Sequence, residues 1–147
     1  MVAFEVRAPR DEQEYQAALR LRWEVLRAPW DQPRGSECDE GEDQARHRIA
    51  VAADGRVLAT GRIHRLGPGK AQIRYMAVHP QLRRHGFGRA ILQALEQDAR
   101  QRGEYQIELH ARETSLAFYQ HMGYRVLGAS HVLFGCIRHY HMEKRLD

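Results

Sequence analysis

Residues 76–89 read MAVHPQLRRHGFGR and change character twice along their length. The run from residue 71 to Val78 is typical of a strand, and Pro80, which has no N–H group, ends it. Arginines and glycines follow, and beyond Phe87 apolar side chains recur with helical spacing until Gly103. The stretch therefore predicts a strand, a basic turn and a helix in direct succession.

The basic turn has the properties of a phosphate-binding site. Gly86 and Gly88 have no Cβ, so a ligand can approach the backbone closely. The start of the helix presents free N–H groups and the positive end of its dipole at the same point. Cationic donors are added by Arg83, Arg84 and Arg89. The alternative is a plain turn with solvated arginines, but the strand, the basic run and the helix start coincide, which favours phosphate.

Two other phosphate-binding motifs do not fit. Gly67–Lys70 is followed by Ala71 rather than by Ser or Thr, which excludes a P-loop. The basic turn lacks the three-glycine spacing of a dinucleotide-binding fold, and no βαβ unit surrounds it.

Length and composition predict one globular domain, residues 1–147, with 43% hydrophobic and 29% charged residues. Apolar runs are too short for a membrane helix, and residues 1–10 lack the apolar core of a signal peptide. Cys38 and Cys136 cannot form a disulfide scaffold. We therefore expect a cytoplasmic protein with reduced thiols and no membrane partner.

The net charge of +4 raises the question of a nucleic-acid partner. Basic residues are scattered and interleaved with acidic ones, except within residues 83–89. We expect no nucleic-acid partner; the rival interpretation, a basic nucleic-acid module, predicts tight, salt-dependent DNA binding.

Periodicity predicts an α+β domain with a mixed sheet and the order βα(α)βββαβαββ. The predicted strands are residues 2–7, 49–53, 57–64, 71–78, 105–110, about 124–127 and 131–144. The predicted helices begin at Asp11 and near Phe87, and a shorter one spans residues 114–122. Residues 28–46 are predicted to be a long ordered loop or a short second helix.

Two motifs carry a resemblance to a known family. Residues 76–88 resemble the acetyl-coenzyme A signature of the GNAT superfamily of N-acyltransferases. Residues 117–124, AFYQHMGY, resemble its second motif, in which a helix carries a Tyr followed by Gly and an aromatic residue. The two motifs lie about 30 residues apart with a strand between them, a specific combination. Residues 21–26, the acidic loop after them and residues 109–112 resemble a small bacterial subgroup of unassigned substrate.

The resemblance implies a mostly antiparallel mixed sheet, flanked by helices and splayed between its central parallel strands, residues 71–78 and 106–110. It implies acetyl-CoA as co-substrate, with the pantetheine arm in that gap and the pyrophosphate on the amides of residues 84–88. The predicted cofactor contacts are Met76, Ala77, Val78, Arg83, Arg84, His85, Gly86, Phe87, Gly88 and Arg89.

The resemblance also assigns two single residues. Tyr119 would stand beside the thioester sulfur and protonate the departing thiolate; the alternative is an ordinary core aromatic. Arg112 stands where many family members carry an Asn that contacts the pantetheine arm. The longer Arg112 side chain could reach a cofactor phosphate or carbonyl instead.

The general base is predicted to be Glu108 or His110, which share one face of their strand. The alternative is a solvated face or a satisfied polar pair. His139, His141 and Glu143 also share one face, and we expect them to be solvated or to line the acceptor site rather than to bind a metal. The acidic run at residues 37–43 is expected to be a solvated loop; the alternative is attraction of a cationic amine.

Together these features predict an N-acetyltransferase that moves acetyl from acetyl-CoA to a primary amine of a small molecule, peptide or protein. Direct attack in a ternary complex is expected, because neither cysteine falls in a motif. The alternative is a catalytically silent coenzyme A-binding or sensor protein of the same fold. The sequence leaves open the acceptor and the oligomeric state, a homodimer included.

Overall fold

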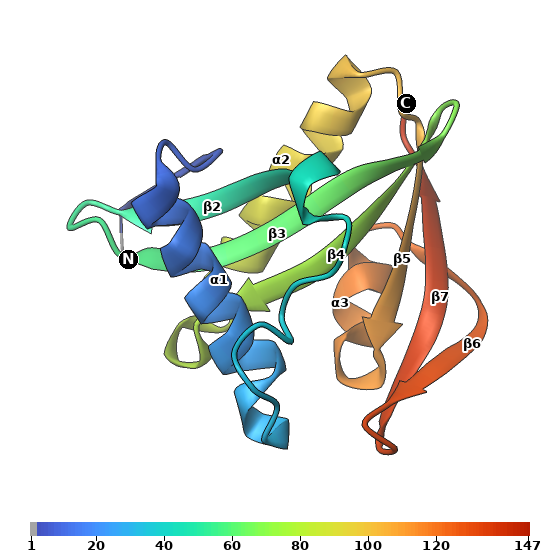
Figure 1. Ribbon diagram of the computed structural model, residues 1–147. Helices are drawn as coiled ribbons and strands as arrows, with labels where there is room; N and C mark the ends of the chain where they lie inside the picture. The colour runs from blue at the N-terminus through green and yellow to red at the C-terminus, as the bar shows by residue number, and fades with distance from the viewer. Residues whose placement is uncertain (1–2) are drawn as a thin grey trace.

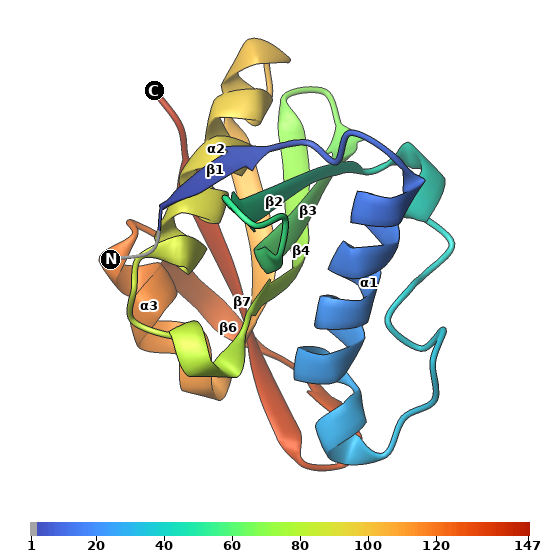
Figure 2. The ribbon, with the colours of Figure 1, turned by 90° about the vertical axis from the view of Figure 1, so that its left-hand side faces the viewer.

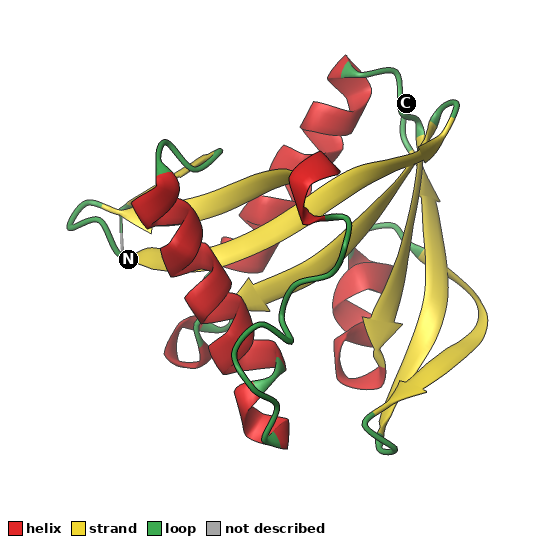
Figure 3. Cartoon of the chain, viewed as in Figure 1, coloured by secondary structure: helices red, strands yellow, loops and turns green. Residues whose placement is uncertain are grey.

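The computed structural model describes residues 3–147 as one seven-stranded sheet with helices on both faces (Figures 1 and 3). The strand order is β1-β2-β3-β4-β5-β7-β6, and β4 and β5 are the parallel pair. The strands are β1 Phe4–Arg7, β2 Arg46–Ala52, β3 Val57–Gly67, β4 Lys70–Val78, β5 Gln106–Arg112, β6 Arg125–Leu133 and β7 Ile137–Arg145. The α-helices are α1 Glu12–Leu26, α2 Phe87–Gln101 and α3 Leu116–His121. The predicted α+β class is confirmed.

The helices divide the two faces of the sheet between them. The main core forms where α2 packs its Ile91, Leu92 and Leu95 side chains against the strands, with α3 on the same face. On the opposite face, Leu21 and Val25 of α1 pack on Ala77. Figure 2 shows α1 and α2 on opposite sides of the sheet, and Figure 1 shows that α1 lies over β2, β3 and β4. The β5, β7 and β6 strands therefore have no helix on the α1 face.

The central parallel strands separate after a short contact. Pairing of β4 with β5 runs only from Lys70↔Gln106 to Gln72↔Glu108. Pairing of β4 with β3 continues to Val78, so beyond Gln72 the β4 edge that faces β5 is open (Figure 1). This confirms the splay that the resemblance implies. The edge contains the backbone of residues 76–78, which is the predicted contact for a pantetheine arm.

A bulge bends β4 inside the open region. The pairing with β3 shifts register between Arg62↔Arg74 and Thr60↔Ala77, and Tyr75 has a φ of 58°. A non-glycine residue with positive φ costs about 1–3 kcal/mol, which the surrounding structure has to supply. The bulge therefore turns the backbone of β4 at the point where the two strands part.

The last hairpin differs from its prediction, which ended the first strand near residue 127. Strand β6 continues to Leu133 and absorbs Gly128 in a bulge. The turn lies at Phe134 and Gly135, whose φ values are 53° and 70°, with Cys136 N–H bonded to Leu133 C=O at 3.1 Å. Two positive φ values make this a type I′ turn, which matches the twist of a hairpin. The presence of a glycine did not identify the position of the turn, because glycine also occurs in β-bulges, as Gly128 does here.

The other departures are small. Residues 28–46 contain two 3₁₀ turns, η1 Ala28–Trp30 and η2 Glu42–Gln44, rather than a second α-helix. The predicted helix at residues 114–122 begins as a 3₁₀ turn before α3. Val2, part of the first predicted strand, lies outside the described residues. None of the helices within residues 3–147 has the length and apolar character needed to cross a membrane.

Candidate active site

The turn after β4 leaves the first N–H groups of α2 open. Gly86, with a φ of 86°, is the N-cap and offers no side chain to the helix. The first helical bond runs from Ala90 N–H to Gly86 C=O at 3.0 Å. The N–H groups of residues 87–89 precede it, and no acceptor within their own helix can reach them. Arg84 also has a positive φ, 67°, which helps to curl the turn.

Helix α1 shows the contrasting arrangement. Its N-cap is Asp11, whose Oδ1 accepts from Glu14 N–H at 2.8 Å, and acidic residues occupy its first turn. The first turn of α2 has no acidic residue and instead carries the exposed Arg89. Arg83 and Arg84 are also exposed. The α2 terminus is therefore suited to an anion supplied from outside the chain, such as a pyrophosphate.

Gly88 connects this turn to the interior of the splay. A Cβ built on it would lie 3.5 Å from Val78 Cγ2 and 3.6 Å from Phe118 Cζ, both ordinary contact distances. The missing side chain thus leaves a shallow space between β4, α2 and α3. This is the place where the predicted cofactor would pass from its phosphates to its thiol.

Tyr119 lies in α3, behind the gap between β4 and β5 in the view of Figure 1. Its side chain is 7% exposed and packs edge-on against the rings of Phe118 and Tyr124. Burial raises the pKa of Tyr119 above its ordinary value, so the phenol keeps its proton. Tyr119 is a core residue and also a potential proton donor, so the two interpretations of the sequence do not exclude each other.

A row of histidines occupies the face of β5 and β7 that α1 leaves uncovered. His110 Nδ1 lies 2.7 Å from Ser130 Oγ, and its ring stacks on His141 at 4.8 Å. His141 Nε2 in turn lies 2.7 Å from Glu108 Oε1, the polar pair considered above as the alternative to a base. The row continues with His131 stacked on His139 at 4.2 Å.

Surroundings lower the pKa of His110 below its ordinary value. Burial is the largest cause, followed by the neighbouring His141 and His131, whose charges disfavour a third. These surroundings therefore favour the neutral imidazole of His110, which has one ring nitrogen able to accept a proton. Within residues 3–147 no three His, Cys, Asp or Glu side chains are arranged to hold a metal ion.

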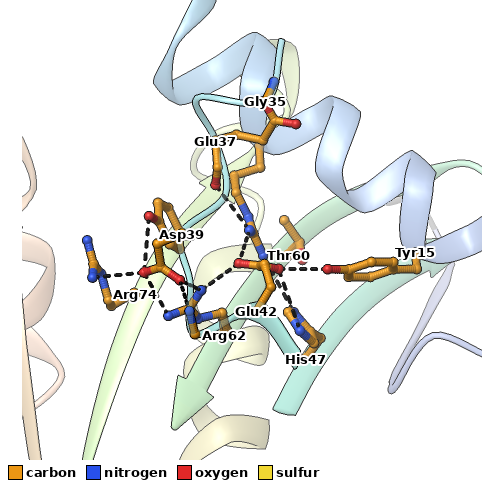
Figure 4. A network of polar contacts seen from close by, with 12 residues as sticks. Tyr15, Gly35, Glu37, Asp39, Glu42, His47, Thr60, Arg62 and Arg74 are labelled. Carbon is orange, nitrogen blue, oxygen red and sulfur yellow. Dashed lines mark hydrogen bonds and ion pairs between the residues drawn. The ribbon is translucent and has the colours of Figure 1, made fainter. Parts of the chain in front are cut away.

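The acidic run at residues 37–43 folds down onto the sheet (Figure 4). Arg62 is 1% exposed and donates to Asp39 Oδ1 at 2.7 Å and to Glu42 Oε2. Glu42 also accepts from Arg22 and from the Tyr15 hydroxyl, each at 2.8 Å. The Arg62 hydrogen bonds lower the pKa of Asp39 to about 2.

The favoured expectation of a solvated acidic loop is therefore wrong for three members of the run, because Glu37, Asp39 and Glu42 are at least partly buried. Arginines on β3, β4 and α1 offset their charge. These three carboxylates are therefore already bound inside the fold, whereas Glu40 and Asp43 of the run are exposed.

Contacts that no sequence pattern predicted link the end of β5 to the segment after α1 and to the β6–β7 turn. The Arg112 guanidinium lies 4.6 Å over the Trp30 ring and donates to Leu26 C=O at 3.0 Å. Trp30, in η1, stacks on Phe134 of the β6–β7 turn with the ring centroids 6.3 Å apart. Figures 1 and 2 both show that hairpin tip beside the end of α1. The predicted cofactor contact of Arg112 stays a prediction.

The chain is similar to known proteins in both sequence and structure. Residues 15–124 match the model of the Acetyltransferase (GNAT) family. The Bacillus subtilis (strain 168) N-acetyltransferase YjcF, itself uncharacterised, is 30% identical over 135 residues, which cover 92% of this chain and 95% of YjcF. A crystal structure of a Lactobacillus plantarum protein superposes with a TM-score of 0.86 at 25% identity, over 99% of both chains. Escherichia coli ElaA has the same fold, with a TM-score of 0.81 at 18% identity over 99% of this chain and 100% of its own.

Proposed function

Because the chain belongs to the acetyltransferase (GNAT) family and is thus an acyltransferase, we propose that it transfers acetyl from acetyl-CoA to a primary amine. The observation that carries the proposal is the uncapped N-terminus of α2 beside the open edge of β4. An unsatisfied anion site and an unpaired strand edge meet at one point. An extended, phosphorylated thioester requires both features.

Each part of the cofactor has a proposed partner. The amides of residues 84–88 hold the pyrophosphate, and Arg83 and Arg89 add cationic donors. The open backbone of residues 76–78 bonds the pantetheine arm as a neighbouring strand would. This arrangement would bring the thioester into the splay, on the same side as Tyr119.

The reaction is a direct transfer with two proton movements. The amine nitrogen attacks the thioester carbon, so that a C–N bond forms and the C–S bond breaks. Tyr119 gives its phenolic proton to the leaving sulfur, and His110 accepts a proton from the amine. Tyr119 can act as the acid because its phenol keeps its proton, and His110 can act as the base because its imidazole is favoured in the neutral form.

His110 fits the role of base better than Glu108. The Glu108 carboxylate is engaged by His141, whereas His110 uses Nδ1 for Ser130 and keeps Nε2 for a substrate. Glu108 then positions His141 against the His110 ring and is a positioning residue rather than a catalytic one.

We place this activity in the cytoplasm, without a nucleic-acid or membrane partner. Both cysteines are free, as expected of a reducing compartment. Several arginines are committed to carboxylates inside the fold; Arg46, for example, bonds Asp98 at 2.7 Å. These arginines are therefore not available to a basic surface.

Two measurements test the proposal. Acetyl-CoA should raise the melting temperature in a dose-dependent way, because a ligand that binds only the folded state stabilises it. A panel of amines should then release free thiol from acetyl-CoA. A flat melting curve at millimolar acetyl-CoA would overturn the proposal. Stabilisation without thiol release from any amine would favour the silent coenzyme A-binding protein.

A further inference from the structure

Two arginines from distant segments meet where the end of β5 lies against the end of α1. Arg27 Nη1, just beyond α1, and Arg112 Nη2, at the end of β5, both donate to the backbone oxygen of Leu26, each at 3.0 Å. The Arg27 Nε also donates to Ser36 C=O at 2.9 Å. Because they share one acceptor oxygen, the two guanidinium groups lie side by side.

Neither guanidinium has a carboxylate partner within residues 3–147. Both are partly buried, whereas the fully buried arginines of this chain, Arg22 and Arg62, pair with Glu42. Burial, then the charges of Arg27 and Arg83, lowers the pKa of Arg112 to about 10. Burial likewise lowers the pKa of Arg27. The site therefore holds two positive charges that repel each other.

Capping of α1 does not account for both charges. The C-terminal end of a helix is equivalent to about half a negative charge, which suits one cation. The acceptors of the two guanidinium groups are the backbone oxygens of Leu26 and Ser36, and neither carries the full negative charge that would offset a cation. Uncompensated charge away from water is costly. An anion bound between them would remove that cost.

Aromatic rings form the walls around the pair. Arg112 lies over Trp30, and Arg27 lies 5.5 Å over Phe134 and 5.7 Å over Tyr75, the bulge residue of β4. Arg112 and the proposed base His110 occupy alternate positions on one face of β5, so their Cα atoms are about 7 Å apart. The arginine pair and the proposed base thus belong to the same face of the sheet.

We propose that the acceptor is a small primary amine that carries a carboxylate, with the carboxylate bound by Arg27 and Arg112 and the rest of the molecule against Trp30 and Phe134. This inference rests on the proposed acetyl transfer and names its substrate class. It assigns Arg112 to the acceptor, in competition with the cofactor contact expected from the sequence. A carboxylate on the acyl group is the other source of the same chemistry.

Matched amines test the proposal. Wild-type protein is assayed with acetyl-CoA and with pairs that differ only in the carboxylate: phenylalanine and phenethylamine, leucine and isopentylamine, β-alanine and ethylamine. At least one acid should exceed its partner about tenfold or more in kcat/KM. In Arg112→Gln and Arg27→Gln, the KM of that acid should rise about 10- to 100-fold, the range for a lost hydrogen bond to a charged group, with the KM of acetyl-CoA little changed.

Control variants guard against misfolding. Arg112→Lys keeps the charge and should recover part of the affinity for the acid, whereas Arg20→Gln removes an exposed charge on α1 and should change nothing. Melting temperatures with coenzyme A at saturation give a readout without turnover. The N-acetylated acid should stabilise wild-type protein and not Arg112→Gln, even if no assayed amine is turned over.

Each contrary result has a meaning. The inference would be overturned if each acid and its decarboxylated amine had equal kcat/KM, and if the ratio of the two values were the same in Arg112→Gln and Arg27→Gln as in wild-type protein. A raised KM for acetyl-CoA in Arg112→Gln would return Arg112 to the cofactor. Preference for succinyl-CoA, lost in Arg112→Gln, would place the carboxylate on the acyl group and overturn the acceptor assignment. Failure to bind acetyl-CoA at all would instead overturn the proposed function.

Discussion

At the scale of single residues, surroundings select which state of each side chain is available for chemistry. Tyr119 keeps its proton because it is buried, and loss of solvation together with two neighbouring histidines favours the neutral form of His110. These states suit the proposed roles of Tyr119 as the acid and His110 as the base in amine attack on a thioester.

Tyr119→Phe tests the acid. The substitution keeps the ring and its packing, so the melting temperature and the affinity for acetyl-CoA should change little. The turnover rate should fall about 100-fold or more, because the hydroxyl acts only as the thiolate leaves. Steady-state kinetics separate the two parameters. An unchanged kcat with weakened cofactor binding would make Tyr119 a packing residue only.

The pH dependence of kcat/KM tests the base. His110 faces His141, His131, Arg74 and Glu108. Because its pKa lies below the ordinary 6.5, the part of the profile that depends on His110 should fall as the pH drops below 6.5 and the imidazole gains a proton. His131→Gln removes one repelling charge and should move this fall to higher pH. A profile that His110→Gln leaves unchanged would exclude His110 as the base.

At the scale of elements, the two long helices use their N-termini differently. Asp11 and nearby glutamates satisfy α1 internally, whereas α2 starts at a glycine and carries arginine in its first turn. The second arrangement is unfavourable without a ligand, since cations at a positive helix end repel the dipole. An anionic cofactor bound at this end would make the electrostatic interaction with the α2 dipole favourable.

Gly88→Ala tests the α2 start. Its Cβ meets only ordinary contact distances, so the fold should tolerate it, and the free energy of unfolding could rise by up to about 1 kcal/mol from helix propensity. The methyl group would occupy the path of the cofactor, and coenzyme A affinity should fall about tenfold or more by calorimetry.

Gly67→Ala is the matched control for this substitution, because Gly67 also has open space around it and lies at the far end of β3. Gly86→Val is less informative, since a branched side chain at a φ of 86° strains the turn regardless of any ligand. Undiminished coenzyme A binding by Gly88→Ala would move the phosphate site elsewhere.

At the scale of the whole molecule, the two halves of the sheet are built differently. Helices enclose β2, β3 and β4 on both faces, whereas β5, β7 and β6 keep one face open. The halves share one hydrophobic core under α2 and α3, but the backbone pairing between them is limited to the short β4–β5 ladder. On the other face the Trp30–Phe134 stack joins them. The splay between β4 and β5 is the consequence of that division.

Arg62→Met tests what holds the acidic loop against the enclosed half. The substitution leaves the exposed Arg74 as the remaining cation beside Asp39 and removes one of the two arginines that pair with Glu42. Urea denaturation should therefore show a loss of about 3 kcal/mol. Arg56→Met breaks an exposed pair with Asp54 and should leave the midpoint almost unchanged. Equal effects of the two substitutions would contradict a structural role for the buried network.

The sequence by itself determined what depends on neighbours along the chain. The strand, basic turn and helix at residues 71–101, the Asp11 cap and the order of elements all follow from local periodicity, proline and glycine. The family motifs then placed the cofactor turn and Tyr119, because each motif is one continuous segment.

Only the tertiary structure decided what depends on residues far apart. The β4 bulge at Tyr75, the hairpin turn at Phe134, the neutralised acidic run and the unpaired Arg27 and Arg112 have no local signal. A sequence does not indicate whether a distant carboxylate pairs with a given arginine. Burial and pairing, which decide its chemistry, arise only when the chain folds.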